Sequence, residues 1–80
     1  MGEEETRPMT YGEKAVGLTF NPSGDTDVRI AKKAYAQIID LLDALRKEAK
    51  SGEQSRLYSI AITETQAAQM WAVKAITWKD

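Results

Sequence analysis

One long and almost uncharged stretch near the end of the chain limits what the chain can fold into. In the twenty-two residues 57–78 (LYSIAITETQAAQMWAVKAITW), only Glu64 and Lys74 carry charge. On a helix, the apolar side chains of this stretch fall on three neighbouring stripes, so apolar groups occupy most of the circumference. A helix of that kind is normally buried inside a large protein or a membrane. This helix keeps several Ser, Thr and Gln residues, and we therefore expect other copies of the chain to cover it.

The chain is too short to bury this helix on its own. Eighty residues form one domain at most, and a chain of this size buries only about 60% of the surface that its unfolded form exposes. The sequence contains no Cys and no His, which removes disulfides and the usual ligands of structural metals. We therefore expect stabilisation by self-assembly, and we predict no metal site and no cofactor.

The charge balance and the residue types exclude several classes of function. With eleven basic and twelve acidic residues the net charge is −1, which argues against binding a nucleic-acid polymer but not against binding one small anion. Without His or Cys, the chain lacks the most versatile groups for proton transfer and nucleophilic attack, so we predict no catalytic residue and no enzymatic activity. The absence of a membrane-spanning segment, of a secretory signal and of Cys predicts a cytoplasmic protein.

Local signals divide the chain into a flexible N-terminus, residues 1–9, and a helical domain, residues 10–80. Thr10 followed three positions later by Glu13 matches a capping box, which predicts one helical turn that ends at Gly17. Asn21-Pro22-Ser23-Gly24-Asp25 has the composition of a tight turn. A loop should therefore separate the short helical turn from the first long helix.

Two long helices are predicted after this loop. Helix one covers about residues 26–50, and its apolar residues recur at alternating three- and four-residue spacing: Val28, Ala31, Tyr35, Ile38, Leu42, Leu45 and Ala49. Ile30, Ala34, Ile39 and Leu41 widen this apolar face. Gly52 is expected to stop helix one, and helix two covers about residues 54–78, with Ser55 or Gly52 as its cap. The short connection makes the helices antiparallel. The predicted fold is all-α, a two-helix hairpin with a short N-terminal helical turn and loop, completed by homo-oligomerisation.

Several side chains are candidates for binding a ligand. Thr63, Thr65, Gln66 and Gln69 interrupt the most apolar helix, and they either bond to one another across an interface or line a pocket that recognises bases or ribose hydroxyls. Four cations, Lys32, Lys33, Arg56 and Lys74, could each meet a phosphate or remain solvated or salt-bridged at the surface. Phe20 could close the end of the hairpin as a hydrophobic plug or contact a ligand. No Walker A loop and no GxGxxG motif is present.

Two segments carry a resemblance to a known family. The segment FNPSGD before the first helix and the segment AITETQAAQMWAVKAITW in the second are similar to the helical-hairpin domain shared by phage anti-CBASS and anti-Thoeris signal sponges. The similarity runs from about Tyr11 to the C-terminus. It implies a homohexamer that sequesters cyclic nucleotide second messengers, either cyclic di- or trinucleotides or cyclic ADP-ribose isomers, without cleaving them. Such capture would serve immune evasion in the cytoplasm of an infected bacterial host cell.

The resemblance also implies roles for particular residues. Phe20, Asn21 and Ser23 match the segment before the first helix, whose counterpart lies near bound nucleotide. Lys32 or Lys33 matches a lysine of helix one that could pair with phosphate. Thr63, Thr65 and Lys74 belong to the matching signature of helix two, where they either touch ligand or hold the oligomer. The alternative is a structural or adaptor hairpin oligomer with no small-molecule ligand.

Overall fold

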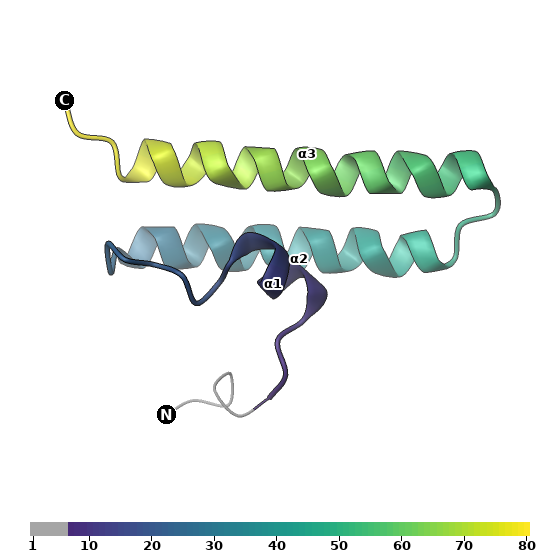
Figure 1. The fold of residues 1–80 in the computed structure, drawn as a ribbon, viewed down its shortest axis with the longest axis horizontal. Helices are drawn as coiled ribbons and strands as arrows, with labels where there is room; N and C mark the ends of the chain where they lie inside the picture. The colour runs from purple at the N-terminus through teal and green to yellow at the C-terminus, as the bar shows by residue number, and fades with distance from the viewer. Residues whose placement is uncertain (1–6) are drawn as a thin grey trace.

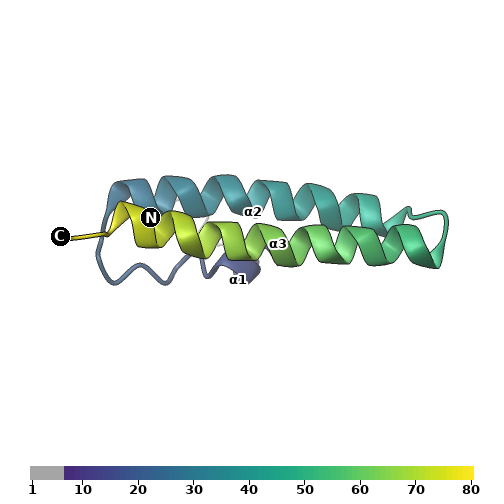
Figure 2. The ribbon, with the colours of Figure 1, turned by 90° about the horizontal axis from the view of Figure 1, so that it is seen from above.

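A computed structural model describes residues 7–80, which form three α-helices: α1 (Tyr11–Val16), α2 (Thr26–Lys47) and α3 (Gly52–Ile76). The two long helices run antiparallel and side by side, and a short turn joins them at one end of the molecule (Figures 1 and 2). The short helix α1 packs against α2, and the loop that follows it leads to the start of α2 (Figure 1). The predicted all-α hairpin with an N-terminal helical turn is therefore confirmed.

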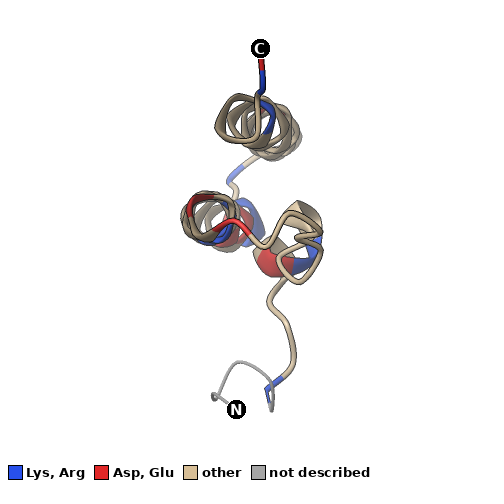
Figure 3. Cartoon of the chain, turned by 90° about the vertical axis from the view of Figure 1, so that its left-hand side faces the viewer, with Lys and Arg blue, Asp and Glu red and all other residues tan. Residues whose placement is uncertain are grey.

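The second helix is the centre of the fold. Seen along the hairpin, α3 and α1 lie on different sides of α2 (Figure 3). The molecule measures 44 × 35 × 13 Å along its principal axes, and its shortest dimension is close to the diameter of a single helix. One layer of helices cannot cover both faces of α3. Large apolar side chains are consequently exposed on it: Leu57, Ile60, Met70 and Trp71.

The core lies where α1 and the following loop meet the two long helices. It consists of Val16, Leu18, Ala36, Ile39 and Ile62. The most buried residue, Ile39, is 0% exposed, whereas Ile38 of the predicted seam is 45% exposed. Val28 of the predicted seam is buried, but in the middle of α2 the deepest burial lies one position later than predicted, at Ala36 and Ile39. The reason is that α2 packs against α1 as well as α3. Burial is therefore greatest on the side of α2 that lies between these two helices, rather than on the side that faces α3 alone.

The turn between the long helices differs from the prediction. Helix α2 ends at Lys47, and Gly52 is the first residue of α3 rather than a stop signal or a cap. The Ser51 hydroxyl caps α3 by accepting a hydrogen bond from the Gln54 N–H at 3.1 Å. At its other end α3 stops at Ile76. The serine and the glutamine three residues later match the capping-box spacing, which was the sequence signal for this boundary.

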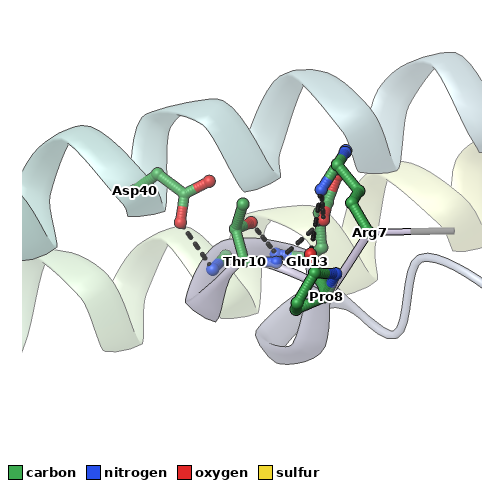
Figure 4. A network of polar contacts seen from close by, with 6 residues as sticks. Arg7, Pro8, Thr10, Glu13 and Asp40 are labelled. Atoms are coloured by element: carbon green, nitrogen blue, oxygen red, sulfur yellow. Dashed lines mark hydrogen bonds and ion pairs between the residues drawn. The ribbon is translucent and has the colours of Figure 1, made fainter. Parts of the chain in front are cut away.

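The predicted capping box of α1 is confirmed. The Thr10 hydroxyl accepts a hydrogen bond from the Glu13 N–H (3.1 Å), and the Glu13 carboxylate accepts one from the Thr10 N–H (2.8 Å; Figure 4). Gly17 ends the helix in the left-handed conformation, with φ 63°. The side chain of Asp40 on α2 accepts a hydrogen bond from the Gly12 N–H at 2.7 Å (Figure 4). The start of α1 is therefore capped both locally and by α2.

Part of the segment predicted to be flexible makes contacts. Residues 1–6 of that segment lie outside the described part of the chain. The Arg7 guanidinium donates hydrogen bonds to both carboxylate oxygens of Glu13, at 2.9 and 2.6 Å, and Met9 packs against the core. Residues 7–9 thus extend the α1 packing unit toward the N-terminus.

Glu13 gives a pH-dependent contribution to stability. The Arg7 guanidinium, followed by the Thr10 N–H, lowers the pKa of this carboxyl from 4.5 to about 2. Its stabilising effect is complete above the pKa of the unfolded chain and is lost as the pH falls from 4.5 toward 2. Because Arg7 is partly exposed, we expect the free energy of unfolding to fall by about 2 kcal/mol more in wild type than in Glu13→Gln over this interval. Thermal unfolding at a series of pH values measures the difference, and parallel curves would contradict it.

Candidate functional site

A cavity lies at the open end of the hairpin, where α2 begins and α3 ends. Its volume is about 260 Å³, and it is bordered by the loop before α2, the first turns of α2 and the C-terminal end of α3. It is lined by Phe20, Asn21, Pro22, Ser23, Val28, Lys32, Val73 and Thr77. The antiparallel arrangement of the long helices brings these segments, far apart in the sequence, to the same end of the molecule (Figure 1).

Hydrogen bonds within the loop fix its polar side chains. The Asn21 amide donates to the Asp25 carbonyl at 3.0 Å and accepts from the Ser23 hydroxyl at 2.8 Å. The Asp25 N–H in turn donates to the Ser23 hydroxyl at 3.2 Å. Gly24, with φ 66°, supplies the left-handed residue that this turn requires. The predicted tight turn is therefore preformed, and it holds Asn21 and Ser23 at the cavity wall.

The loop presents an aromatic ring to solvent. Phe20 is 71% exposed, so the interpretation of this residue as a hydrophobic plug is wrong. Lys32 lies behind it and is only 6% exposed. The Lys32 ammonium donates hydrogen bonds to the Gly17 carbonyl at 3.0 Å and to the Phe20 carbonyl, and it lies 5.6 Å from the centroid of the Phe20 ring. Lys33, the next residue, is exposed.

The groups around the cavity suit a planar, polar ligand. Among the described residues that line the cavity, one, Lys32, has an ionisable side chain. The exposed ring of Phe20 offers a stacking surface, and Asn21, Ser23 and Thr77 offer hydrogen-bonding groups. Asp25 and Asp27 stand at the start of α2, so this helix terminus does not favour an anion despite its dipole. A phosphate would have to meet cations from other positions.

The remaining candidates on α3 lie outside this cavity. The hydroxyls of Thr63 and Thr65 donate to the carbonyls of Ser59 and Ala61 on the same helix, at 3.1 and 2.6 Å. Lys74 follows the cavity residue Val73, but its ammonium lies 5.3 Å from the ring centroid of Trp71. A separate hollow of about 280 Å³ is lined by Ala67, Met70, Trp71 and Lys74. The two threonine hydroxyls thus have partners within one chain.

Arg56 lies at the opposite end of the hairpin. Its guanidinium donates to both carboxylate oxygens of Glu53, at 2.9 and 2.7 Å, in an exposed ion pair. Lys74 lies eighteen positions further along the same helix, which corresponds to about 27 Å along the axis. A single chain therefore brings Phe20, Asn21, Ser23 and Lys32 together, whereas Arg56 could reach the same ligand only from another copy.

Four residues of the cavity were not predicted as site residues: Pro22, Val28, Val73 and Thr77. Val73 and Thr77 could have been found from the hairpin itself. Once the helices are antiparallel and of similar length, the last turn of α3 must lie beside the first turn of α2. In the sequence, both residues were interpreted as part of the apolar stretch that contributes to the oligomer.

A comparison with known protein families identifies the family to which the chain is related. The sequence profile of the Acb2/Tad1 hairpin domain matches residues 13–77, which include the loop, both long helices and every residue that lines the cavity. The chain belongs to the Acb2/Tad1 hairpin family. This family is known for anti-defence nucleotide sponges, the family of anti-CBASS and anti-Thoeris proteins, so the resemblance noted in the sequence is confirmed. Searches of curated proteins and of solved structures gave no match.

The Acb2/Tad1 hairpin is a binding domain rather than a catalytic one. In the part of the chain that the structure describes, no three His, Cys, Asp or Glu residues are grouped as a metal site requires. None of the helices in residues 7–80 is both long and apolar enough to cross a lipid bilayer.

Proposed function

We propose that the chain is a phage anti-defence sponge, which captures a cyclic nucleotide second messenger in the infected bacterial cell and holds it uncleaved. The observation that carries this proposal is the preformed cavity with the exposed ring of Phe20 at its edge. Stacking of a base on an aromatic ring contributes about 1–3 kcal/mol. Asn21 and Ser23, held in place by the loop, would give the base or ribose its hydrogen-bonding partners.

One chain would hold only part of such a ligand. The cavity of about 260 Å³ lies below the usual range of small-molecule sites, about 300 to 1,000 Å³. A cyclic nucleotide has two or more phosphates and two or more bases or riboses, so the rest of it needs another surface. The exposed apolar face of α3 independently calls for other copies. We therefore propose a homo-oligomer, a hexamer by resemblance, with the ligand between subunits.

The phosphates would be met by cations at the rim. Lys33 and Lys74 are both exposed and belong to α2 and α3 near the cavity end, whereas Arg56 could contribute only from another copy. An unpaired phosphate in a partly apolar pocket is costly, so at least one such cation per phosphate is expected. Thr63 and Thr65 would then serve the packing of α3 in the oligomer.

Capture without cleavage gives a direct test. The protein is incubated with a panel of cyclic di- and trinucleotides and cyclic ADP-ribose isomers, and the free ligand is measured by chromatography before and after heat denaturation. We expect at least one member to be depleted by the folded protein and to return chemically unchanged after heating. A chemically altered product would identify an enzyme.

The same experiment separates the sponge from the alternative. A structural or adaptor hairpin would deplete no member of the panel, because its polar residues would only fix the register of the oligomer. Heat-denatured protein, added before the ligand, is the control for non-specific adsorption. No depletion of any member by folded protein would contradict the proposed function.

A further inference from the structure

The Lys32 ammonium binds the backbone of the loop that carries Phe20. It comes from the second turn of α2 and donates to the carbonyls of Gly17 and Phe20, the two ends of the turn between α1 and the cavity. The Phe20 N–H closes the same turn by donating to the Gly17 carbonyl at 2.9 Å. One cation therefore connects the end of α1, the loop and α2 immediately behind the exposed ring.

This environment differs from that expected of a phosphate-binding lysine, whose ammonium would be accessible to the ligand. The Lys32 side chain is almost fully buried, and a buried ammonium is stable only where acceptors satisfy it. Two carbonyls and the face of an aromatic ring within about 6 Å fulfil this requirement without a ligand. Lys33 points about 100° away around the helix and is exposed. The two adjacent lysines thus have different environments.

We propose that Lys32 is a positioning residue that clamps the loop and presents the Phe20 ring to a nucleobase, and that it does not bind phosphate. This inference rests on the function proposed above. The direction of an exposed ring depends on the backbone that carries it, and here the backbone is held at the Phe20 carbonyl itself. Without the clamp, the ligand would have to order the loop on binding, and affinity would be lost to this ordering.

The clamp can be tested in the protein without ligand. Hydrogen exchange is measured residue by residue in wild type, Lys32→Met and the control Lys33→Met. We expect faster exchange of the Phe20 and Leu18 amides in Lys32→Met alone, with amides in the middle of α2 and α3 unchanged. Unchanged exchange in the loop would overturn the clamp. If Lys32→Met does not fold, Lys32→Gln, which keeps one donor group, is compared in the same way.

The role in binding is tested by a double-mutant cycle between Lys32→Met and Phe20→Ala. Calorimetry measures affinity for the panel nucleotide that wild type captures. We expect each single change to weaken binding by about tenfold to a hundredfold. A residue that acts through the ring has no further effect once the ring is gone, so the double variant should bind about as weakly as Phe20→Ala. A general loss of stability would not produce this coupling.

Salt dependence separates the clamp from a phosphate contact. The loss caused by Lys32→Met should be equal at low and high salt, because the ammonium faces the loop rather than the ligand. The proposal would be overturned if the affinity losses of the two single variants multiply in the double variant and if the loss caused by Lys32→Met shrinks as salt is raised. Lys32 would then be a phosphate ligand. If wild type captures no panel nucleotide, the proposed function fails, while the exchange rates still decide whether Lys32 clamps the loop.

Discussion

The free energy of unfolding of a Gly12→Ala variant should be about 3 kcal/mol lower than that of wild type. A Cβ atom at this position would lie 2.1 Å from the Ala36 carbonyl oxygen and 2.9 Å from the Asp40 carboxylate. The first of these atoms belongs to the backbone of α2, so it cannot rotate away. Helix α1 would have to move off α2 and take the core residues Val16 and Leu18 with it.

The matched control for this change is Gly52→Ala at the first position of α3. No atom lies within 4 Å of a Cβ built there, and alanine restricts the unfolded chain, so stability should be unchanged or about 0.5 kcal/mol higher. Urea unfolding followed by circular dichroism compares the variants at one protein concentration, because the proposed assembly would make stability concentration-dependent. Equal stability of the two variants would show that α1 does not need its close approach to α2.

The second large effect concerns assembly: Trp71→Glu should convert most of the protein to smaller species at micromolar concentration. Trp71 is 68% exposed in the single chain, and together with Met70 it forms a broad apolar area that water would otherwise contact. A carboxylate placed there would have to lose much of its hydration when subunits meet, although Lys74 lies one turn away as a cation. We expect the dissociation constant to rise by about a hundredfold or more. Multi-angle light scattering measures the mass of each variant.

Trp78→Glu provides the same substitution outside α3. Trp78 lies beyond the end of the helix, and its indole N–H donates to the Asp80 carboxylate at 3.0 Å. Its effect on mass should be smaller than that of Trp71→Glu. A wild-type dimer would satisfy the need to cover α3 but would contradict six copies. A folded wild-type monomer would contradict both expectations.

The features that could be predicted from sequence depend on neighbouring residues. The capping box of Thr10 and Glu13 acts over three positions, and Gly17 ends α1 through its own backbone conformation. The hairpin follows in a similar way from two long helical segments and a connection too short for any other arrangement. Even the wrong assignment of Gly52 as a helix stop or cap concerned neighbouring residues, because the capping-box spacing of Ser51 and Gln54 is present in the sequence.

The features that could not be predicted depend on where distant segments meet. The placement of α1 on α2, and with it the burial of Ile39 instead of Ile38, depends on the close fit of Gly12 against Ala36. Lys32 has the sequence signature of a surface cation, and its burial arises only because the loop returns two carbonyls to it. Phe20, a candidate plug in the sequence, is exposed, which depends on the path that the loop takes past α2.

Native mass spectrometry of the chain mixed with the nucleotide panel tests the central claim most directly, because one spectrum reports both the number of subunits and the mass of what they hold. We expect an assembly of several copies, six by resemblance, that carries a cyclic nucleotide at its unmodified mass, and we expect Phe20→Ala to give the same assembly with little or no ligand. A folded monomer, an assembly without ligand, or a bound species heavier by one water would contradict the account of a self-assembled hairpin that captures its ligand intact.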